Sequence, residues 1–235
     1  MAVTDTLIYH PSLDRYLRFV ATTTGRDKLI RACQFFARFY AWYLFRTNKS
    51  PNEIAPYEAI KKQFGLTRML LRVGKNIEHF KAACVAADSK NLDTMLRFCA
   101  VGHQLGYAGY LSFDTAAYLD AAGIMKTPMI KRLQREANKC WICGLLFSTA
   151  SGIYSLYVLK QQENRIDMKI GEDVVASRKI QKERAAINLQ LIADLCDLTI
   201  PTSSIGLVNL DDGIIGLAGT FSSLIGIYTQ WKKTA

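Results

Sequence analysis

The chain has 235 residues, of which 50% are apolar and 21% charged, and its 30 Lys and Arg against 20 Asp and Glu give a net charge of +10. A chain this apolar can bury a core, which excludes intrinsic disorder. Six irregularly spaced cysteines argue against a secreted disulfide scaffold, and five prolines and 15 glycines leave little room for a many-turned β-sandwich. What remains is an all-α protein, basic and unusually apolar, for which a membrane is a natural partner.

Apolar spacing predicts two helices at the start of the chain. The first begins near Ser12, and the second runs from residue 27 to about residue 47. Seven aromatic side chains fall within residues 35–45. They could stack on nucleic-acid bases, but rings that alternate around an apolar helix suit a membrane interface or a core better, and we expect no nucleic-acid partner. Residues 48–56 are predicted to form a polar loop.

A third helix, predicted over residues 57–87, carries an apolar face opposed to a basic face. The basic arc holds Arg68, Arg72, Lys75 and His79. Such a helix is typical of a membrane interface, whereas the alternative is a surface helix of a bundle with a solvated basic side. The first interpretation predicts a membrane-binding site made of Leu66, Arg68, Met69, Leu70, Arg72, Val73, Lys75, Ile77 and Phe80, with Cys84 completing the apolar arc.

A glycine pattern marks the fourth helix, which is predicted over residues 92–113. Gly102, Gly106 and Gly109 would let two helices approach closely. We expect these glycines to support homo-oligomerisation, the alternative being a merely permissive helix. A short helix over residues 115–122 should follow.

No motif typical of a catalytic or metal-binding site stands out along the chain. Cys140 and Cys143 have the CxxC spacing but lack a second pair at zinc spacing, so packing explains them better than metal or redox work. No Ser/His/Asp or paired-carboxylate spacing is present. We therefore expect neither catalysis nor a bound metal or cofactor.

Two segments without any charged residue, 141–159 and 213–231, approach the ~20 apolar residues that cross a bilayer. The first belongs to a long helix predicted over residues 129–161, and the second to a final helix that follows another helix over residues 173–198 and a loop over residues 201–213. Each window is predicted to lie in the membrane, with burial in a helical core as the alternative.

The charge distribution orients these windows. Residues 1–140 hold 21 Lys and Arg against 11 Asp and Glu, whereas residues 160–212 hold 7 against 9. Because basic segments stay in the cytosol, both ends of the chain should be cytosolic and residues 160–212 should form the loop across the membrane. The predicted fold is an all-α, multi-helix integral membrane protein. Residues 1–125 form a cytosolic or interfacial region with amphipathic helices, and residues 126–235 a membrane-anchoring region with about two apolar spans.

Three parts of the chain resemble a known family. Residues 10–38 contain His-Pro-Ser-Leu, Gly-Arg-Asp-Lys-Leu and Gln-Phe-Phe-Ala-Arg in this order, residues 60–81 form the amphipathic segment, and residues 213–226 form a glycine-rich apolar end. Together they are similar to the peroxisomal proliferation factor family, peroxin-eleven, in its fungal form.

The resemblance implies a non-enzymatic protein of the peroxisomal membrane with both termini in the cytosol. Such a protein would self-associate, bend and elongate an anionic phospholipid membrane, and recruit a dynamin-like fission GTPase and its membrane adaptor. An import receptor for peroxisomal membrane proteins would deliver it. Lys232 and Lys233 have the form of a coat-binding dilysine signal, although two lysines after a last span also serve as interfacial anchors. The alternative functions are a peroxisomal solute channel and a soluble helical adaptor.

Overall fold

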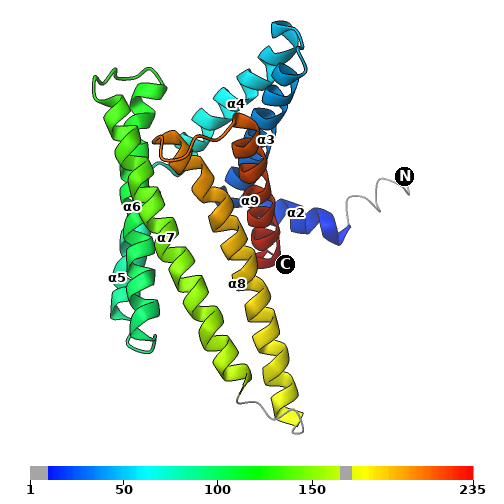
Figure 1. Cartoon of the computed structure of the whole chain (residues 1–235), viewed down its shortest axis with the longest axis vertical. Coiled ribbons are helices and arrows are strands. Elements are labelled where there is room, and N and C mark those ends of the chain that lie inside the picture. Colours follow the sequence, from blue (N-terminus) through cyan, green and yellow to red (C-terminus); the bar gives the residue numbers. More distant parts are fainter. Residues whose placement is uncertain (1–9, 165–170, 235) are drawn as a thin grey trace. The chain divides into compact units, whose positions relative to one another are not determined.

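The structure is a computed structural model that describes residues 10–164 and 171–234, with side chains resuming at Val175 after the gap. Every regular element in these ranges is a helix, which confirms the all-α class (Figure 1). The helices are α2 (Pro11–Ala21), α3 (Thr23–Arg46), α4 (Pro51–Arg72), α5 (Lys75–Asp88), α6 (Thr94–Ala121), α7 (Ile130–Glu163), α8 (Gly171–Ser204) and α9 (Asp212–Lys233).

Helix α4 begins earlier than predicted. Pro51 occupies the first helical position, where its missing N–H costs nothing. Glu53 Oε1 accepts hydrogen bonds from the Ser50 hydroxyl at 2.9 Å and from the Ser50 amide at 3.4 Å, an N-terminal arrangement related to the capping box. The polar loop predicted over residues 48–56 therefore ends at Ser50.

The single amphipathic helix predicted over residues 57–87 is wrong, because two helices occupy this segment. Helix α4 ends at Arg72 and α5 begins at Lys75. Between them Gly74 adopts φ of 81°, a left-handed conformation that glycine reaches without a steric penalty. The two halves of the predicted face therefore belong to different helices.

Two further boundaries differ from the prediction. Helix α6 is continuous across residues 94–121, where we expected a break near residue 114. Helix α8 continues through Pro201 to Ser204, so the loop predicted from Pro201 begins later. By contrast, the long helix predicted over residues 129–161 agrees with α7 to within two residues.

The described residues pack as two compact units. The first unit combines residues 10–71 with residues 210–234, and the second comprises residues 72–164 and 171–209. The predicted division at residue 125 lies between α6 and α7, inside the second unit. That division concerns placement in a membrane, and it stays a prediction.

In the first unit, α3 and α9 are antiparallel and lie unusually close together. Gly213, Gly216 and Gly219 of α9 face the aromatic side of α3. A methyl group built on Gly216 would lie 2.6 Å from the backbone nitrogen of Phe39. The α3 backbone therefore rests directly on α9, as small residues allow.

Helix α2 caps the C-terminal end of α9. Arg15 Nη2 donates to the Trp231 carbonyl at 2.9 Å, and Arg18 Nε donates to the Thr234 carbonyl at 3.2 Å. Phe19 is 1% exposed and packs on the Trp231 ring. These contacts satisfy carbonyls that a helix end leaves without partners and bring the first described helix beside the end of the chain.

In the second unit, α5, α6, α7 and α8 form an antiparallel bundle (Figure 1). Helices α6 and α7 meet where Gly106 faces Gly144, and Tyr110 stacks on Trp141 with ring centres 5.0 Å apart. Leu111 and Ala137 complete a buried cluster at this end of the bundle.

Candidate membrane-binding surface

The apolar residues of the predicted membrane-binding site lie on the outside of the protein. Leu70, Val73, Ile77 and Phe80 are exposed, from 46% at Val73 to 69% at Ile77, and Leu66 and Met69 are half-buried. They line the end of α4, the Gly74 junction and α5. We call Val73, Ile77 and Phe80, which all belong to the second unit, the α4–α5 apolar surface.

Two arginines of the predicted basic face point inward. Arg68 is 8% exposed, and its Nε donates to Asp27 Oδ1 at 3.1 Å while its Nη1 donates to Gln34 at 2.8 Å. Arg72 pairs with Asp114 at 2.9 Å and donates to the Tyr110 hydroxyl at 2.8 Å. Arg68 and Arg72 therefore do not form the exposed basic face that the helical projection predicted.

The polarity of this segment is thus the reverse of a surface helix in water, where charges face out and apolar residues face in. Lys75 is half-buried, so of the four predicted basic residues none is fully exposed. Glu78 and Lys81 of α5 are exposed, but the inward ion pairs of Arg68 and Arg72 beside exposed apolar side chains fit surroundings of low polarity. This segment is the strongest candidate for contact with acyl chains.

In the first unit, helix α9 also exposes an apolar side. Its glycine side packs on α3, and its opposite side is an exposed apolar stripe at helical spacing: Ile214, Leu217, Phe221, Leu224 and Tyr228. The sequence marked this end as glycine-rich, but not which side of the helix the glycines would cover.

Among the described residues, one helix is long and apolar enough to cross a membrane by length and composition, and it is α7. It contains the predicted window 141–159, and Leu146, Ile153 and Tyr157 are exposed along it. Helix α9, which contains the window 213–231, does not reach the same threshold. The predicted count of two spans through these windows is therefore unconfirmed.

A basic stripe that the sequence reasoning missed lies at the start of α7. Lys131, Arg132, Arg135 and Lys139 are all exposed, and Glu136, paired with Lys139 at 2.8 Å, is the one acidic residue among them. The spacing of residues 131, 135 and 139 immediately before an uncharged window was the available signal. Positive charge therefore borders the membrane-crossing candidate on the surface of the same helix.

The glycines predicted for self-association make a close helix contact within one chain. Methyl groups built on Gly102, Gly106 and Gly109 would meet Phe147, Gly144 and Cys140 of α7 at 2.6–3.0 Å. The close approach is present, but its partner is α7 rather than a second copy. Self-association through these glycines stays a prediction, and it would require α7 to move away.

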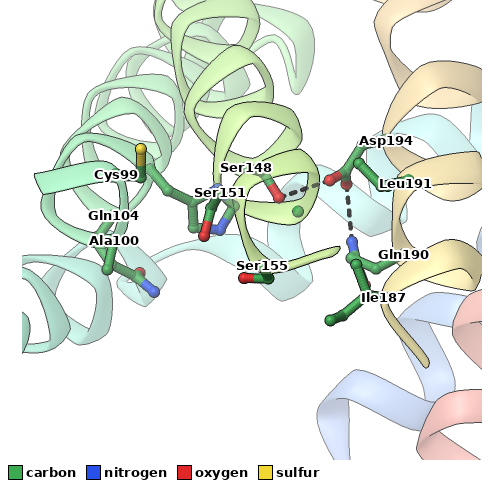
Figure 2. A pocket seen from close by; sticks show the side chains of 12 residues that line it. Cys99, Ala100, Gln104, Ser148, Ser151, Ser155, Ile187, Gln190, Leu191 and Asp194 are labelled. Carbon is green, nitrogen blue, oxygen red and sulfur yellow. Dashed lines mark hydrogen bonds between the residues drawn. The ribbon is translucent and has the colours of Figure 1, made fainter. Parts of the chain in front are cut away.

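A cavity of about 300 Å³ with both polar and apolar lining residues lies between α6, α7 and α8 (Figure 2). Its wall carries hydroxyls from α7, an imidazole and an amide from α6, and a carboxylate from α8, which are Ser148, Ser151, Ser155, His103, Gln104 and Asp194. Asp194 is 3% exposed. The sequence reasoning did not select any of these residues.

Comparison with known proteins gives a match over nearly the whole chain. Residues 13–231 match the family described as "Peroxisomal biogenesis factor 11 (PEX11)". The chain is 28% identical to "Peroxisomal membrane protein PMP30B" of Candida boidinii, covering 97% of both proteins, and 28% identical to "Peroxisomal membrane protein PMP27" of Saccharomyces cerevisiae, covering 99% of this chain and 100% of the relative.

A more distant relative carries the family's own name. The chain is 24% identical to "Peroxisomal biogenesis factor 11" of Schizosaccharomyces pombe, covering 94% of this chain and 96% of the relative. No solved structure matches. The resemblance seen in the sequence is confirmed, and the chain belongs to the peroxisomal biogenesis factor 11 family of peroxisomal membrane proteins.

Proposed function

We propose that this protein curves and elongates the peroxisomal membrane before fission, and so controls peroxisome number and size, by inserting apolar helix surfaces into one leaflet. The observation that carries the proposal is the reversed polarity of the α4–α5 segment. Arg68 and Arg72 are held inside by carboxylates, while Val73 and Ile77 face outward. An apolar surface inserted to the acyl boundary expands the leaflet that it enters.

The expected insertion energy is moderate. Complete removal of a Val, Leu, Ile or Phe side chain from water is worth about 1.5–3 kcal/mol. The three residues of the α4–α5 apolar surface are roughly half exposed, so their insertion would contribute about 2–4.5 kcal/mol together. The inward arginines act as positioning residues, because their ion pairs fix which side of each helix faces out.

Anionic headgroups would be contacted by the α7 basic stripe rather than by Arg68 and Arg72. Each exposed Lys or Arg near an anionic surface contributes about 1 kcal/mol. The four cations of the stripe are exposed and directly precede the window 141–159. They would hold the N-terminal end of α7 at the cytosolic surface, with an attraction that salt weakens.

If α7 crosses the membrane, then α8 is the segment that returns. Asn138 Nδ2 donates to the Ser204 hydroxyl at 2.9 Å near one end of the pair, and Arg184 binds Glu163 near the other. These contacts set residues 184–204 of α8 alongside the whole crossing part of α7. Asp194 and Asp197 lower the hydropathy of this stretch, which explains why neither hydropathy nor our windows selected it.

A returning α8 moves the second crossing away from α9. Helix α9 would then lie at the cytosolic surface with its exposed apolar stripe in the interface. The α2 cap on the end of α9 supports placing both termini on one side, because Arg15 and Arg18 bind carbonyls at the end of the chain. A protease-accessible tag distinguishes the two topologies in intact peroxisomes.

The informative position for the tag is Val208, which lies between α8 and α9 and is 47% exposed. If α8 returns, a tag at Val208 is cleaved from outside, whereas a tag after Asn164 is protected until detergent is added. If α9 makes the second crossing instead, both tags are protected. A control tag at the C-terminus is cleaved in either case.

Vesicle tubulation tests the remodelling proposal itself. Full-length protein is reconstituted with anionic vesicles, and Ile77→Asp is compared with Thr67→Asp, which adds the same charge at an exposed polar position of α4. We expect the first variant to lose tubulation and the second to keep it, with both retained in the membrane. Equal tubulation by the two variants contradicts the proposal.

The partners that the family resemblance implies remain part of this proposal. They are a second copy of the chain, a dynamin-like fission GTPase with its membrane adaptor, the peroxisomal membrane-protein import receptor, and coat proteins at Lys232 and Lys233. The Lys232 ammonium lies 4.4 Å from the Tyr228 ring centre, a contact that also suits an interfacial anchor. Loss of coat-protein binding after Lys232→Ser and Lys233→Ser substitution distinguishes the signal from the anchor.

A solute channel is the second candidate function, and the polar groups in the cavity between α6, α7 and α8 are the observation that favours it. Polar and ionisable groups at membrane depth often line solute pathways. Conductance across planar bilayers by the reconstituted protein would support the channel. Tubulation without conductance would leave the remodelling proposal alone.

A further inference from the structure

We propose that the cavity between α6, α7 and α8 is a binding site for a monovalent cation, with Asp194 as its charged group. In Figure 2 the Asp194 carboxylate points between Ser148 and Gln190. Its Oδ2 accepts from the Ser148 hydroxyl at 2.6 Å, and its Oδ1 accepts from Gln190 Nε2 at 2.8 Å. Both donors are uncharged.

Among the described residues, neither lysine nor arginine compensates the charge of this carboxylate. In the part of the chain that the structure describes, no Lys or Arg forms an ion pair with Asp194. The charge-bearing groups near it are His103 from α6 and Asp197 one turn further along α8; α7 contributes only hydroxyls to this wall. A buried carboxylate whose hydrogen bonds come only from neutral donors is costly to keep ionised, and a cation bound in the cavity would offset this cost in place of a proton.

The rest of the wall mixes apolar side chains, such as Ile187 and Leu191, with polar groups that can accept hydrogen bonds. His103 Nδ1 lies 3.0 Å from the Gly144 carbonyl, which can only accept, so this nitrogen carries the proton. Ser151 and Ser155 add hydroxyl oxygens that can accept from an ammonium group or coordinate a hard cation. An anion would be repelled by the carboxylate.

Size and charge indicate the class of cation. A volume of about 300 Å³ compares with about 30 Å³ for one water in the liquid, so a hydrated ion or a small organic ammonium fits. Within the described residues no three His, Cys, Asp or Glu side chains gather to hold a metal ion. One carboxylate balances one positive charge. The shared chemistry is therefore that of K⁺, Na⁺ or a primary ammonium such as ethanolammonium.

Thermal unfolding of the full-length protein in detergent tests the site. The chloride salts of K⁺, Na⁺ and ethanolammonium are compared at constant ionic strength with the chloride of N-methyl-D-glucammonium, a much bulkier secondary ammonium ion that serves as the control. At ten times the dissociation constant, a ligand of the folded state raises Tm by about 3–6 °C for a chain of this size. A Tm shift with K⁺ or Na⁺ indicates an inorganic ion as the ligand, whereas a shift with ethanolammonium alone indicates an amine.

Three variants decide whether the shift belongs to this cavity. Asp194→Asn should abolish it, while Glu183→Gln, which removes an exposed negative charge from the same helix, should keep it. Ser155→Leu fills the cavity while leaving the carboxylate intact, so it should also abolish the shift even if Asp194→Asn fails to fold. Equal Tm in all four cations, or a shift that survives Ser155→Leu, overturns the proposal. Neither result bears on tubulation, which the α4–α5 apolar surface would carry.

Discussion

The inward ion pair between Arg68 and Asp27 provides a test that separates a structural role from lipid contact. Both side chains are nearly buried, at 10% and 12% exposure. Removing one partner of a buried pair costs about 3–5 kcal/mol, because the other charge stays buried without compensation. We therefore expect Asp27→Leu or Arg68→Met alone to destabilise the detergent-solubilised protein by about 3–5 kcal/mol, or Tm by about 6–20 °C.

The double variant Asp27→Leu/Arg68→Met should recover most of this loss, since replacing a buried pair by apolar side chains is often neutral. The double variant should also tubulate anionic vesicles as the unmodified protein does, because the outward apolar surface no longer depends on a charge at residue 68. If Arg68 instead acted by contacting lipid headgroups, the double variant would regain stability but remain unable to bind or deform anionic vesicles. A cost below about 1 kcal/mol for either single variant, as in exposed pairs, would refute the buried-pair reasoning.

Three other perturbations follow from the packing and the charges. Gly106→Leu should lower the Tm of the full-length protein, because a methyl group alone would lie 2.6 Å from the α7 backbone; weakened crosslinking between copies at unchanged Tm would instead favour the self-association role. Lys131→Glu with Arg135→Glu should weaken binding to anionic vesicles at low salt and have little effect at high salt, as measured by flotation. Burial raises the pKa of Asp212, but the hydrogen bond and charge of Arg38 outweigh it and hold the pKa below its ordinary value. A lowered pKa stabilises the folded protein above the ordinary pKa of the group, and this stabilisation is lost as pH falls through the folded-state pKa. Asp212→Asn should therefore cost at most about 1 kcal/mol of stability at pH 7, seen as a lower Tm, and should not lower Tm in strong acid.

The sequence predicted the helices best where the apolar pattern was long and uninterrupted. Helix α7 followed from its spacing and its uncharged window, and the glycines of α6 correctly indicated a close helix contact. The break at Gly74 could not be predicted, because glycine is tolerated both inside a helix and in the left-handed turn that ends one. Tertiary packing decides between the two.

The direction of the amphipathic segment was also beyond sequence reasoning. A helical projection separates Arg68 and Arg72 from Ile77, but it does not say which side faces the protein. That choice depends on Asp27, which is 41 residues away from Arg68, and on Asp114 in α6. Likewise, the glycine pattern of α6 could not distinguish α7 from a second copy, since both present the same kind of surface.

A membrane crossing by α8, which we propose above, was not predicted from the sequence for a different physical reason. The carboxylates of α8 reduce the hydropathy of residues 184–204, although Asp194 points into the bundle and is 3% exposed. Hydropathy counts a charged residue in the same way whether it faces lipid or a polar interior. The contacts at both ends of the α7–α8 pair were needed to propose this crossing.

Depth-dependent fluorescence quenching tests membrane insertion by α5 most directly. A fluorophore is attached at residue 77 of the full-length protein in vesicles and compared with one at residue 67, using lipids brominated along the acyl chain and a water-soluble quencher. We expect the label at residue 77 to be quenched by the brominated lipids and shielded from the aqueous quencher, and the label at residue 67 to show the opposite. Equal aqueous quenching at both positions would contradict insertion of the α4–α5 apolar surface.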